Sequence, residues 1–239
     1  MNFPKIMGCP CAPINEKLIF EFFEKNIGNK GYTVAINAKK IHKFQSDITL
    51  RNIINKSLLP YPDGAGAVLG LKWIHGLHSQ KINMPSLSLE YANKKNIKTF
   101  IVGSTVDIHK IAIEKIKKKY PNLKLVGNSH GYNPKESIIN NIVLSRPALI
   151  LVALGSPRQE MFAAELQEHI DFGLIIGCGG ALDIISGNLK RAPTFMINNN
   201  LEWLYRIKQE PLRLKQSFFL FKFTLKLMQE ILLKKTKYR

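Results

Sequence analysis

The chain has 239 residues, 45% hydrophobic and 22% charged, which is an ordinary globular composition and enough to bury a sizeable core. Its net charge of +18 indicates a polyanionic partner, such as nucleic acid, an anionic membrane surface or a phosphate-bearing substrate. A general bias of the sequence towards lysine is the alternative cause.

The three cysteines argue against a disulfide framework, because their number is odd and their spacing irregular. Cys9 and Cys11 stand close together and Cys178 stands alone, which favours a reducing compartment and offers too few ligands for zinc. The N-terminus lacks the apolar stretch of a signal peptide, and no run approaches the roughly 18 to 20 apolar residues of a spanning helix. We expect a cytoplasmic protein that could bind a membrane surface.

Strand and helix patterns alternate along the chain. Strands are expected in 32–37, 97–104, 122–129, 147–157 and 172–177, and helices in 46–60, 66–77, 87–96, 105–120, 135–145, 158–170 and 181–187. Three segments repeat a buried strand, small residues and a helix. This repeat predicts an α/β protein with a parallel sheet, helices on both of its faces, and a ligand crevice at the carboxyl edge.

Glycines follow three of these strands, at Gly103, at Gly155 and at Gly177–Gly180. A single glycine at a strand end is usually structural. Three of them at one edge of a parallel sheet are better explained by a shared binding crevice.

Asp63 lies in "YPDGAGAV" (61–68), after the prolines at 60 and 62 and before the glycines at 64 and 66. Asp in such a stretch is most often a turn residue. As a catalytic group, it would act as a general base that deprotonates a hydroxyl nucleophile. No second acidic residue stands close by to form a metal site, and the chain contains no Asp-x-Asp.

The segment "GSPRQE" (155–160) follows an apolar strand and opens a helix, where free backbone N–H groups favour phosphate. Arg158 adds a bidentate cation, and Gln159 can hydrogen-bond a sugar or an amide. The alternative is simple capping, with Ser156 as the N-cap residue and Pro157 in the first helical position.

Two other loops are candidate ligand contacts. "GCGGALDIISG" (177–187) offers a second backbone cradle with Asp183 after it, although its glycine spacing is not that of a dinucleotide-binding motif. In "GNSHGYNP" (127–134), His130 and Tyr132 could stack on a ring or hydrogen-bond to it. Two functions stay open at this point, a nucleotide-dependent oxidoreductase and a basic nucleic-acid binder. The sequence contains no motif specific to either of them.

The C-terminal segment, residues 201–239, holds ten Lys and Arg against three Glu. Lys222 and Lys226 alternate there with Phe and Leu, a pattern typical of a basic amphipathic helix on an anionic bilayer. A helix docked on the core, or a contact between copies of the chain, are the alternatives.

Seven segments occur in the order seen in the WecG/TagA/CpsF glycosyltransferases, which the chain resembles over nearly its whole length. They are "INAKK", "YPDGAGAV", "FIVGS", "YPNLKLVGNSHGY", "RPALILVALGSPRQEMF", "GCGGALDIISGNLKRAP" and "LEWLYRIKQEPLRL". The resemblance implies a Rossmann-like core (1–193) and a basic helical C-terminal appendage (194–239). It implies an inverting, metal-independent enzyme without cofactors. Such an enzyme moves N-acetylmannosamine, or its uronic acid, from a UDP donor to an undecaprenyl-diphosphate-linked sugar for cell-surface polysaccharide.

The resemblance also implies roles for residues. Asp63 would be the general base, and Asn37 would position the substrate. The donor-binding residues would be Gly103, Ser104, Gly131, Tyr132, Gly155, Arg158, Gln159, Glu160, Gly179, Gly180 and Asp183. The acceptor diphosphate would meet Lys81, Arg191, Arg206 and Arg213.

The sequence departs from the family pattern at three positions. Lys81 stands where an Arg is usual, Ala35 where many members carry Thr, and Gln216 where a third Arg of the appendage is expected. The resemblance further implies a peripheral protein on the inner face of the cytoplasmic membrane, with no nucleic-acid partner. Self-association through the surface that the appendage covers is also expected.

Overall fold

The computed structural model describes residues 3–198, 201–209 and 223–231. The strands are β1 (Lys5–Ile6), β2 (Cys9–Pro10), β3 (Gly31–Ile36), β4 (Leu59–Pro62), β5 (Thr99–Gly103), β6 (Leu125–Ser129), β7 (Leu149–Ala153) and β8 (Leu174–Gly177). The helices are α1 (Glu16–Asn26), α2 (Ala38–Phe44), α3 (Ile48–Lys56), α4 (Ala65–His75), α5 (Met84–Lys94), α6 (Val106–Lys119), α7 (Lys135–Ser145), α8 (Arg158–His169), α9 (Ala181–Ser186), α10 (Thr194–Asn198) and α11 (Glu202–Gln209). Residues 223–231 form a further helix.

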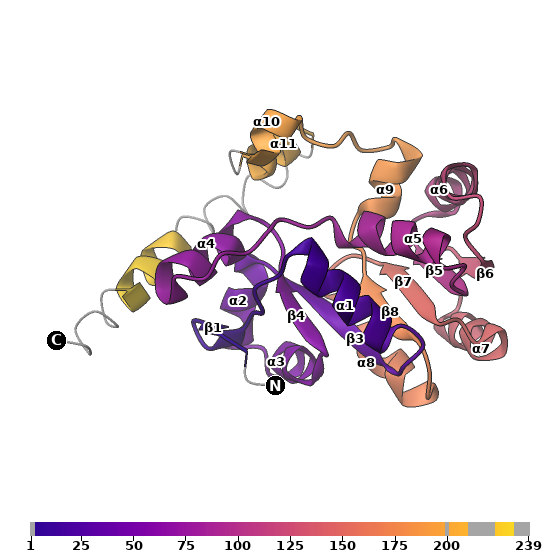
Figure 1. Ribbon diagram of the computed structural model, residues 1–239, viewed down its shortest axis with the longest axis horizontal. Helices are drawn as coiled ribbons and strands as arrows, with labels where there is room; N and C mark the ends of the chain where they lie inside the picture. The colour runs from indigo at the N-terminus through magenta and orange to yellow at the C-terminus, as the bar shows by residue number, and fades with distance from the viewer. Residues whose placement is uncertain (1–2, 199–200, 210–222, 232–239) are drawn as a thin grey trace.

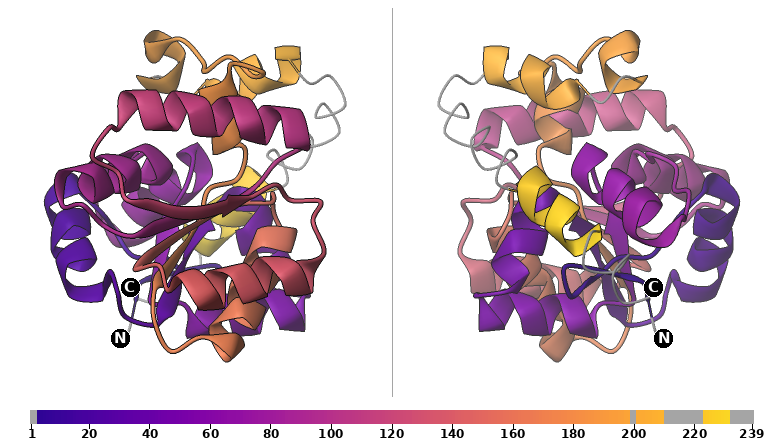
Figure 2. Two further views of the ribbon diagram at one scale, coloured as in Figure 1. Left: turned by 90° about the vertical axis from the view of Figure 1, so that its right-hand side faces the viewer. Right: turned by 90° about the vertical axis from the view of Figure 1, so that its left-hand side faces the viewer.

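Six strands form one parallel sheet in the order β4-β3-β8-β7-β5-β6. The central strands β5 and β7 are buried along their whole length, as continuous apolar runs in a parallel sheet predict. Figure 2 shows the sheet between two layers of helices. This confirms the predicted fold class.

Two hydrophobic clusters lie on opposite faces of the sheet. One contains side chains of α2, α3, α7 and α8, and the other contains side chains of α1, α5, α6 and α9. Helix α6 leaves β5 towards one face and leads to β6, whereas α8 leaves β7 towards the other face and leads to β8, so these neighbouring strands form a topological switch point. The loops after β5 and β7 therefore border the crevice in which ligands of open α/β sheets bind, and the loops after β3 and β8 lie along the same carboxyl edge.

The sequence prediction missed the first part of the chain and one strand of the sheet. The sequence does not predict the β1–β2 hairpin, α1 or α2, and it predicts a helix that ends at residue 60, followed by a break at 61–66, where the structure has β4. The prolines at 60 and 62 disfavour a central strand, but β4 is an edge strand, where a missing N–H is tolerated.

The C-terminal part of the chain contacts the core at two places. On the carboxyl-edge side, Lys81 donates from Nζ to the carbonyl of Ile197 in α10 (2.7 Å), and Gln209 of α11 bonds the backbone of Lys190 in both directions. Helix 223–231, yellow in Figure 1, lies beside α4. Its Phe223 and Leu227 are buried in the core cluster (3% and 1% exposed), as the docked-helix alternative predicts for this part of the segment.

Candidate active site

Asp63 and Asn37 lie at the carboxyl ends of two paired strands. The parallel register that pairs Ile36 with Pro62 places the two residues side by side, and the Asp63 amide donates to the Ile36 carbonyl at 2.7 Å. Asp63 is exposed, and Gly64 after it has a φ of 82°, a value that glycine adopts readily. The turn and base interpretations are thus compatible, because the turn presents the carboxylate at the edge of the sheet.

The side chain of Asn37 caps α2, accepting a hydrogen bond from the Lys40 amide at 3.0 Å. N-capping by Asn satisfies one of the free amides of the first turn. Asn37 is half-buried, so the cap fixes the residue beside Asp63 without removing it from solvent.

A buried polar cluster joins this corner to the loop after β8. Lys40 and Glu160 form an ion pair at 2.7 Å (Nζ to Oε1) with side chains only 4% and 3% exposed. Glu160 also accepts from Gln159 Nε2 at 3.0 Å, and Gln159 Oε1 accepts from the Gly179 amide at 2.9 Å. The amide of Gln159, expected to face the donor, is therefore directed to protein groups.

At the other end of the edge, backbone groups of three loops converge. Gly103 (φ 135°) and Ser104 (φ 62°) turn the chain after β5, and the Ser104 amide donates to the Ala153 carbonyl at 3.0 Å. The Ser104 carbonyl accepts from the Gly131 amide at 2.8 Å. Buried His109 braces the turn through contacts to the Gly103 carbonyl and to Asn128.

The loop after β7 leads into α8 as expected, with Gly155 in a left-handed conformation (φ 72°). Arg158 is the first residue of α8 and is exposed, with a long contact of 3.5 Å from Nη2 to the Gly131 carbonyl. Tyr132 is 69% exposed next to that carbonyl. The expected cap is wrong in detail, because Pro157 holds the N-cap position and Ser156 lies outside the helix.

In the loop after β8, Gly179 has a φ of 53°. A Cβ atom added to Gly179 or to Gly180 would have no other atom within 4 Å. This open space allows a ligand to approach the backbone closely. Asp183 lies in the first turn of α9 and accepts from the Asn188 side chain at 3.3 Å. It is thus partly engaged in holding the segment that follows α9.

The expected acceptor cations are placed only in part. Burial lowers the pKa of Lys81, and the charge of Glu202 opposes this shift. Arg191 is exposed on the segment between α9 and α10. The backbone of Arg206 lies in α11, and Arg213 lies outside the described residues, as do Lys215, Gln216 and Lys222.

Burial raises the pKa of one tyrosine and two cysteines around the buried polar cluster. Burial raises the pKa of Tyr61 well above its ordinary value, and the charges of Asp63, Cys178 and Glu160 act in the same direction. Burial also raises the pKa of Cys9 and of Cys178 to about 12. All three cysteines are free thiols.

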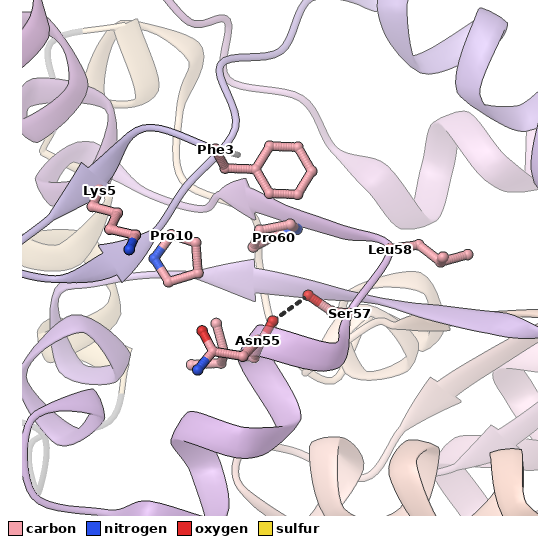
Figure 3. A pocket seen from close by; sticks show the side chains of 8 residues that line it. Phe3, Lys5, Pro10, Asn55, Ser57, Leu58 and Pro60 are labelled. Atoms are coloured by element: carbon pink, nitrogen blue, oxygen red, sulfur yellow. Dashed lines mark hydrogen bonds between the residues drawn. The ribbon is translucent and has the colours of Figure 1, made fainter. Parts of the chain in front are cut away.

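Within residues 3–198, 201–209 and 223–231, no group of three or more His, Cys, Asp and Glu side chains could hold a metal ion. None of the helices in those ranges is long and apolar enough to cross a bilayer. A cavity of about 440 Å³ opens where α3 leads into β4 (Figure 3). It lies at the start of β4, whereas the candidate site lies at the strand ends.

Lys40 and His109 are the site residues that the sequence analysis missed. Lys40 stands in "INAKK", a segment singled out only for its family pattern, next to the exposed Lys39. His109 stands one turn into a lysine-rich helix. A polar residue shortly after a buried strand is the only signal that could have pointed to either of them.

The sequence matches the model of the glycosyl transferase WecG/TagA/CpsF family over residues 4–237. It is 35% identical over 191 residues to the N-acetylglucosaminyldiphosphoundecaprenol N-acetyl-beta-D-mannosaminyltransferase of Bacillus subtilis (strain 168), covering 78% of this chain and 75% of the relative. The enzyme of the same name from Bacillus spizizenii (strain ATCC 23059 / NRRL B-14472 / W23) is 31% identical over 190 residues, which cover 77% and 74%.

Proposed function

Because the chain belongs to the WecG/TagA/CpsF family of glycosyl transferases, we propose that it transfers an N-acetylmannosamine-type sugar. The donor would be a UDP-sugar and the acceptor an undecaprenyl-diphosphate-linked sugar. Two relatives named for N-acetylmannosaminyl transfer to N-acetylglucosaminyldiphosphoundecaprenol, each covering about three quarters of the chain, carry this proposal. The exposed Asp63 beside Asn37 supports it, since transfer to a hydroxyl calls for a base at the edge of the crevice.

In the proposed reaction, Asp63 accepts the proton of the acceptor hydroxyl as its oxygen attacks C1 of the donor sugar. The bond from C1 to the diphosphate oxygen breaks, and UDP leaves with the electron pair. A single displacement of this kind inverts the anomeric centre. Asn37, held in place by its cap to α2, would position the sugar beside the base.

The charge of the leaving diphosphate would be balanced by backbone amides and by Arg158 rather than by a metal. Support comes from the open glycine loop at 179–180 and from the exposed guanidinium at the start of α8. Amide donors aimed at a developing anion stabilise a transition state strongly in a water-poor crevice. The remaining donor contacts would come from Gly103, Ser104, Gly131, Tyr132, Gly155 and Asp183.

The acceptor would enter from the side of α10 and α11. Lys81, Arg191, Arg206 and Arg213 are the cations proposed to meet its diphosphate. The contacts of Lys81 and Lys190 with residues 197 and 209 support this, because they attach α10 and α11 to the core at the carboxyl edge. We further propose that residues 194–239 act as an appendage at the inner face of the cytoplasmic membrane, and that the chain associates with itself there.

The test is transfer from UDP-N-acetylmannosamine to a short-chain lipid-diphosphate-N-acetylglucosamine with EDTA present. We expect UDP release and a disaccharide product of inverted anomeric configuration, read by NMR. Loss of activity with EDTA, restored by a metal ion, would contradict the proposal that the enzyme needs no metal. A product with retained anomeric configuration would contradict the single displacement. If a panel of UDP-sugars gives no product at all, the proposed reaction is wrong.

A further inference from the structure

The ion pair of Lys40 and Glu160 is not explained by stability. Both side chains are withdrawn from water almost completely, and burying two charges costs about as much as their attraction returns. Within the described part of the chain, the second oxygen of Glu160, Oε2, is buried and has no hydrogen-bond partner. A buried oxygen in this state calls for an explanation, and a role in function is one.

The pair connects the two sides of the crevice. On one side, Lys40 Nζ donates at 2.7 Å to the carbonyl of Ala35, near the end of β3 and two residues before Asn37. On the other side, Glu160 Oε1 accepts from Gln159 Nε2, whose partner oxygen Oε1 holds the Gly179 amide. A continuous chain of hydrogen bonds therefore runs from the end of β3 to the loop after β8.

Gln159 is closely confined within this chain. A Cβ on Gly177 would stand 2.7 Å from Gln159 Nε2, so the loop and the side chain are packed together. The left-handed conformation of Gly179 directs its amide to Gln159 rather than back into β8. The position of residues 177–180 thus depends on the orientation of one amide, and that orientation depends on Glu160.

We propose that Lys40, Glu160 and Gln159 are positioning residues that set the 177–180 loop relative to the corner formed by Asn37 and Asp63. This inference rests on the proposed function, since it takes that loop to hold the donor. Glu160 and Gln159 then act through the backbone of Gly179 and need not touch the sugar nucleotide. This chain of hydrogen bonds from Ala35 through Lys40, Glu160 and Gln159 to Gly179, here called the relay, keeps the donor at the distance from Asp63 at which the acceptor hydroxyl can attack.

The test replaces the pair by uncharged side chains, in the double variant K40M/E160L, because removing one partner alone would leave a buried charge. The matched control is K135M/E165L, which removes the exposed ion pair between α7 and α8 (2.6 Å; 48% and 38% exposed). We expect both variants to fold. In K40M/E160L, kcat should fall roughly 10- to 100-fold with KM for the lipid acceptor nearly unchanged, as expected for a misplaced donor.

Hydrogen exchange gives a readout that does not depend on activity. The peptide containing Gly179 should exchange faster in K40M/E160L than in the wild type and in K135M/E165L. If that exchange and kcat both stay at the wild-type level, the relay does not position the loop. If K40M/E160L fails to fold, the double variant K40M/E160Q, which also removes both charges and keeps the shape of the Glu160 side chain, takes its place with the same criteria. If the wild type is inactive with every donor, the proposed function is wrong. The hydrogen-exchange comparison would still show whether the relay positions the 177–180 loop.

Discussion

Around β3 and β4 the carboxyl edge of the sheet carries ionisable side chains, whereas around β5 and β7 it carries mainly backbone. The first region contains Asp63 and the buried pair of Lys40 and Glu160. The second contains Gly103 and Gly155, both at positive φ, and loops that hydrogen-bond one another through amides and carbonyls. The strand order places β8, with its glycine loop, between these two regions.

The difference indicates how a transferase can divide its work. Proton transfer needs a side chain whose charge can change, and such a group is placed where its neighbours are also side chains. Binding a diphosphate needs hydrogen-bond donors that do not titrate and that stay in place, and backbone amides have both properties. Substitution of Asp63 in the first region should therefore lower activity without unfolding the protein, and substitution of a positive-φ glycine such as Gly103 in the second should lower stability first.

Asp63→Asn should have the largest effect on activity. It removes the proposed base and keeps the size of the side chain, so kcat should fall by roughly 10² or more with little change in the melting temperature. The measurement is UDP release under saturating donor and acceptor. The control is Asp171→Asn, since the Asp171 side chain is 81% exposed in the loop before β8, at the opposite edge of the sheet. Full activity in Asp63→Asn would leave Asp63 as a turn residue.

Gly103→Ala should have the largest effect on stability. The backbone at 103 has a φ of 135°, and a Cβ there would stand 2.2 Å from the carbonyl oxygen of Ala153, so either the turn or β7 must move. We expect a loss of about 3 kcal/mol or more in the free energy of unfolding, measured by urea denaturation. Gly180→Ala is the matched case, because its φ is −87° and its Cβ would meet nothing within 4 Å. Equal losses in both variants would contradict the assigned strain at Gly103.

Much of the fold could be predicted, because the buried strands of a parallel sheet are short apolar runs and the helices between them are amphipathic. The strands β5, β7 and β8 and the helices α6, α7 and α8 lie where the sequence places them. The edge strand β4 could not be recognised, since two prolines in four residues look like a turn until the sheet shows which side of the strand lacks a partner.

The buried half of the site could not be predicted from local patterns. Lys39 and Lys40 are adjacent, yet one is exposed and the other buried, because only Lys40 faces Glu160, which lies 120 residues further along the chain. In the same way, Phe223 and Leu227 have the spacing of a membrane-facing stripe and of a core-facing one. Tertiary contacts decide both cases, and a local pattern carries no information about them.

Arg158→Ala tests whether the backbone region binds the diphosphate. A charge-assisted hydrogen bond contributes about 1.5–3 kcal/mol, so the affinity for UDP should fall roughly 10- to 100-fold. Arg158→Lys should recover part of this loss, because the charge returns without the bidentate geometry. Calorimetry at fixed ionic strength measures both, with Lys94→Ala as a control for net charge, since Lys94 is exposed at the far end of α5. An unchanged Kd in Arg158→Ala would exclude this arginine from the donor site.

The last expected effect is confined to alkaline pH, and it originates in the thiols of Cys9 and Cys178. Burial raises the pKa of Cys9 and Cys178 from 9.0 to about 12, so both thiols stay protonated in the folded protein at pH values where they ionise in the unfolded chain. The unfolded state then binds fewer protons, and the free energy of unfolding should fall as pH rises from about 9 to about 12. The slope should be about 1.4 kcal/mol per pH unit for each thiol. Urea denaturation across this range should show a shallower slope in C9A/C178A. A slope equal to that of the wild type would mean that other groups, such as Tyr32 with its pKa raised to about 12, control the alkaline limit.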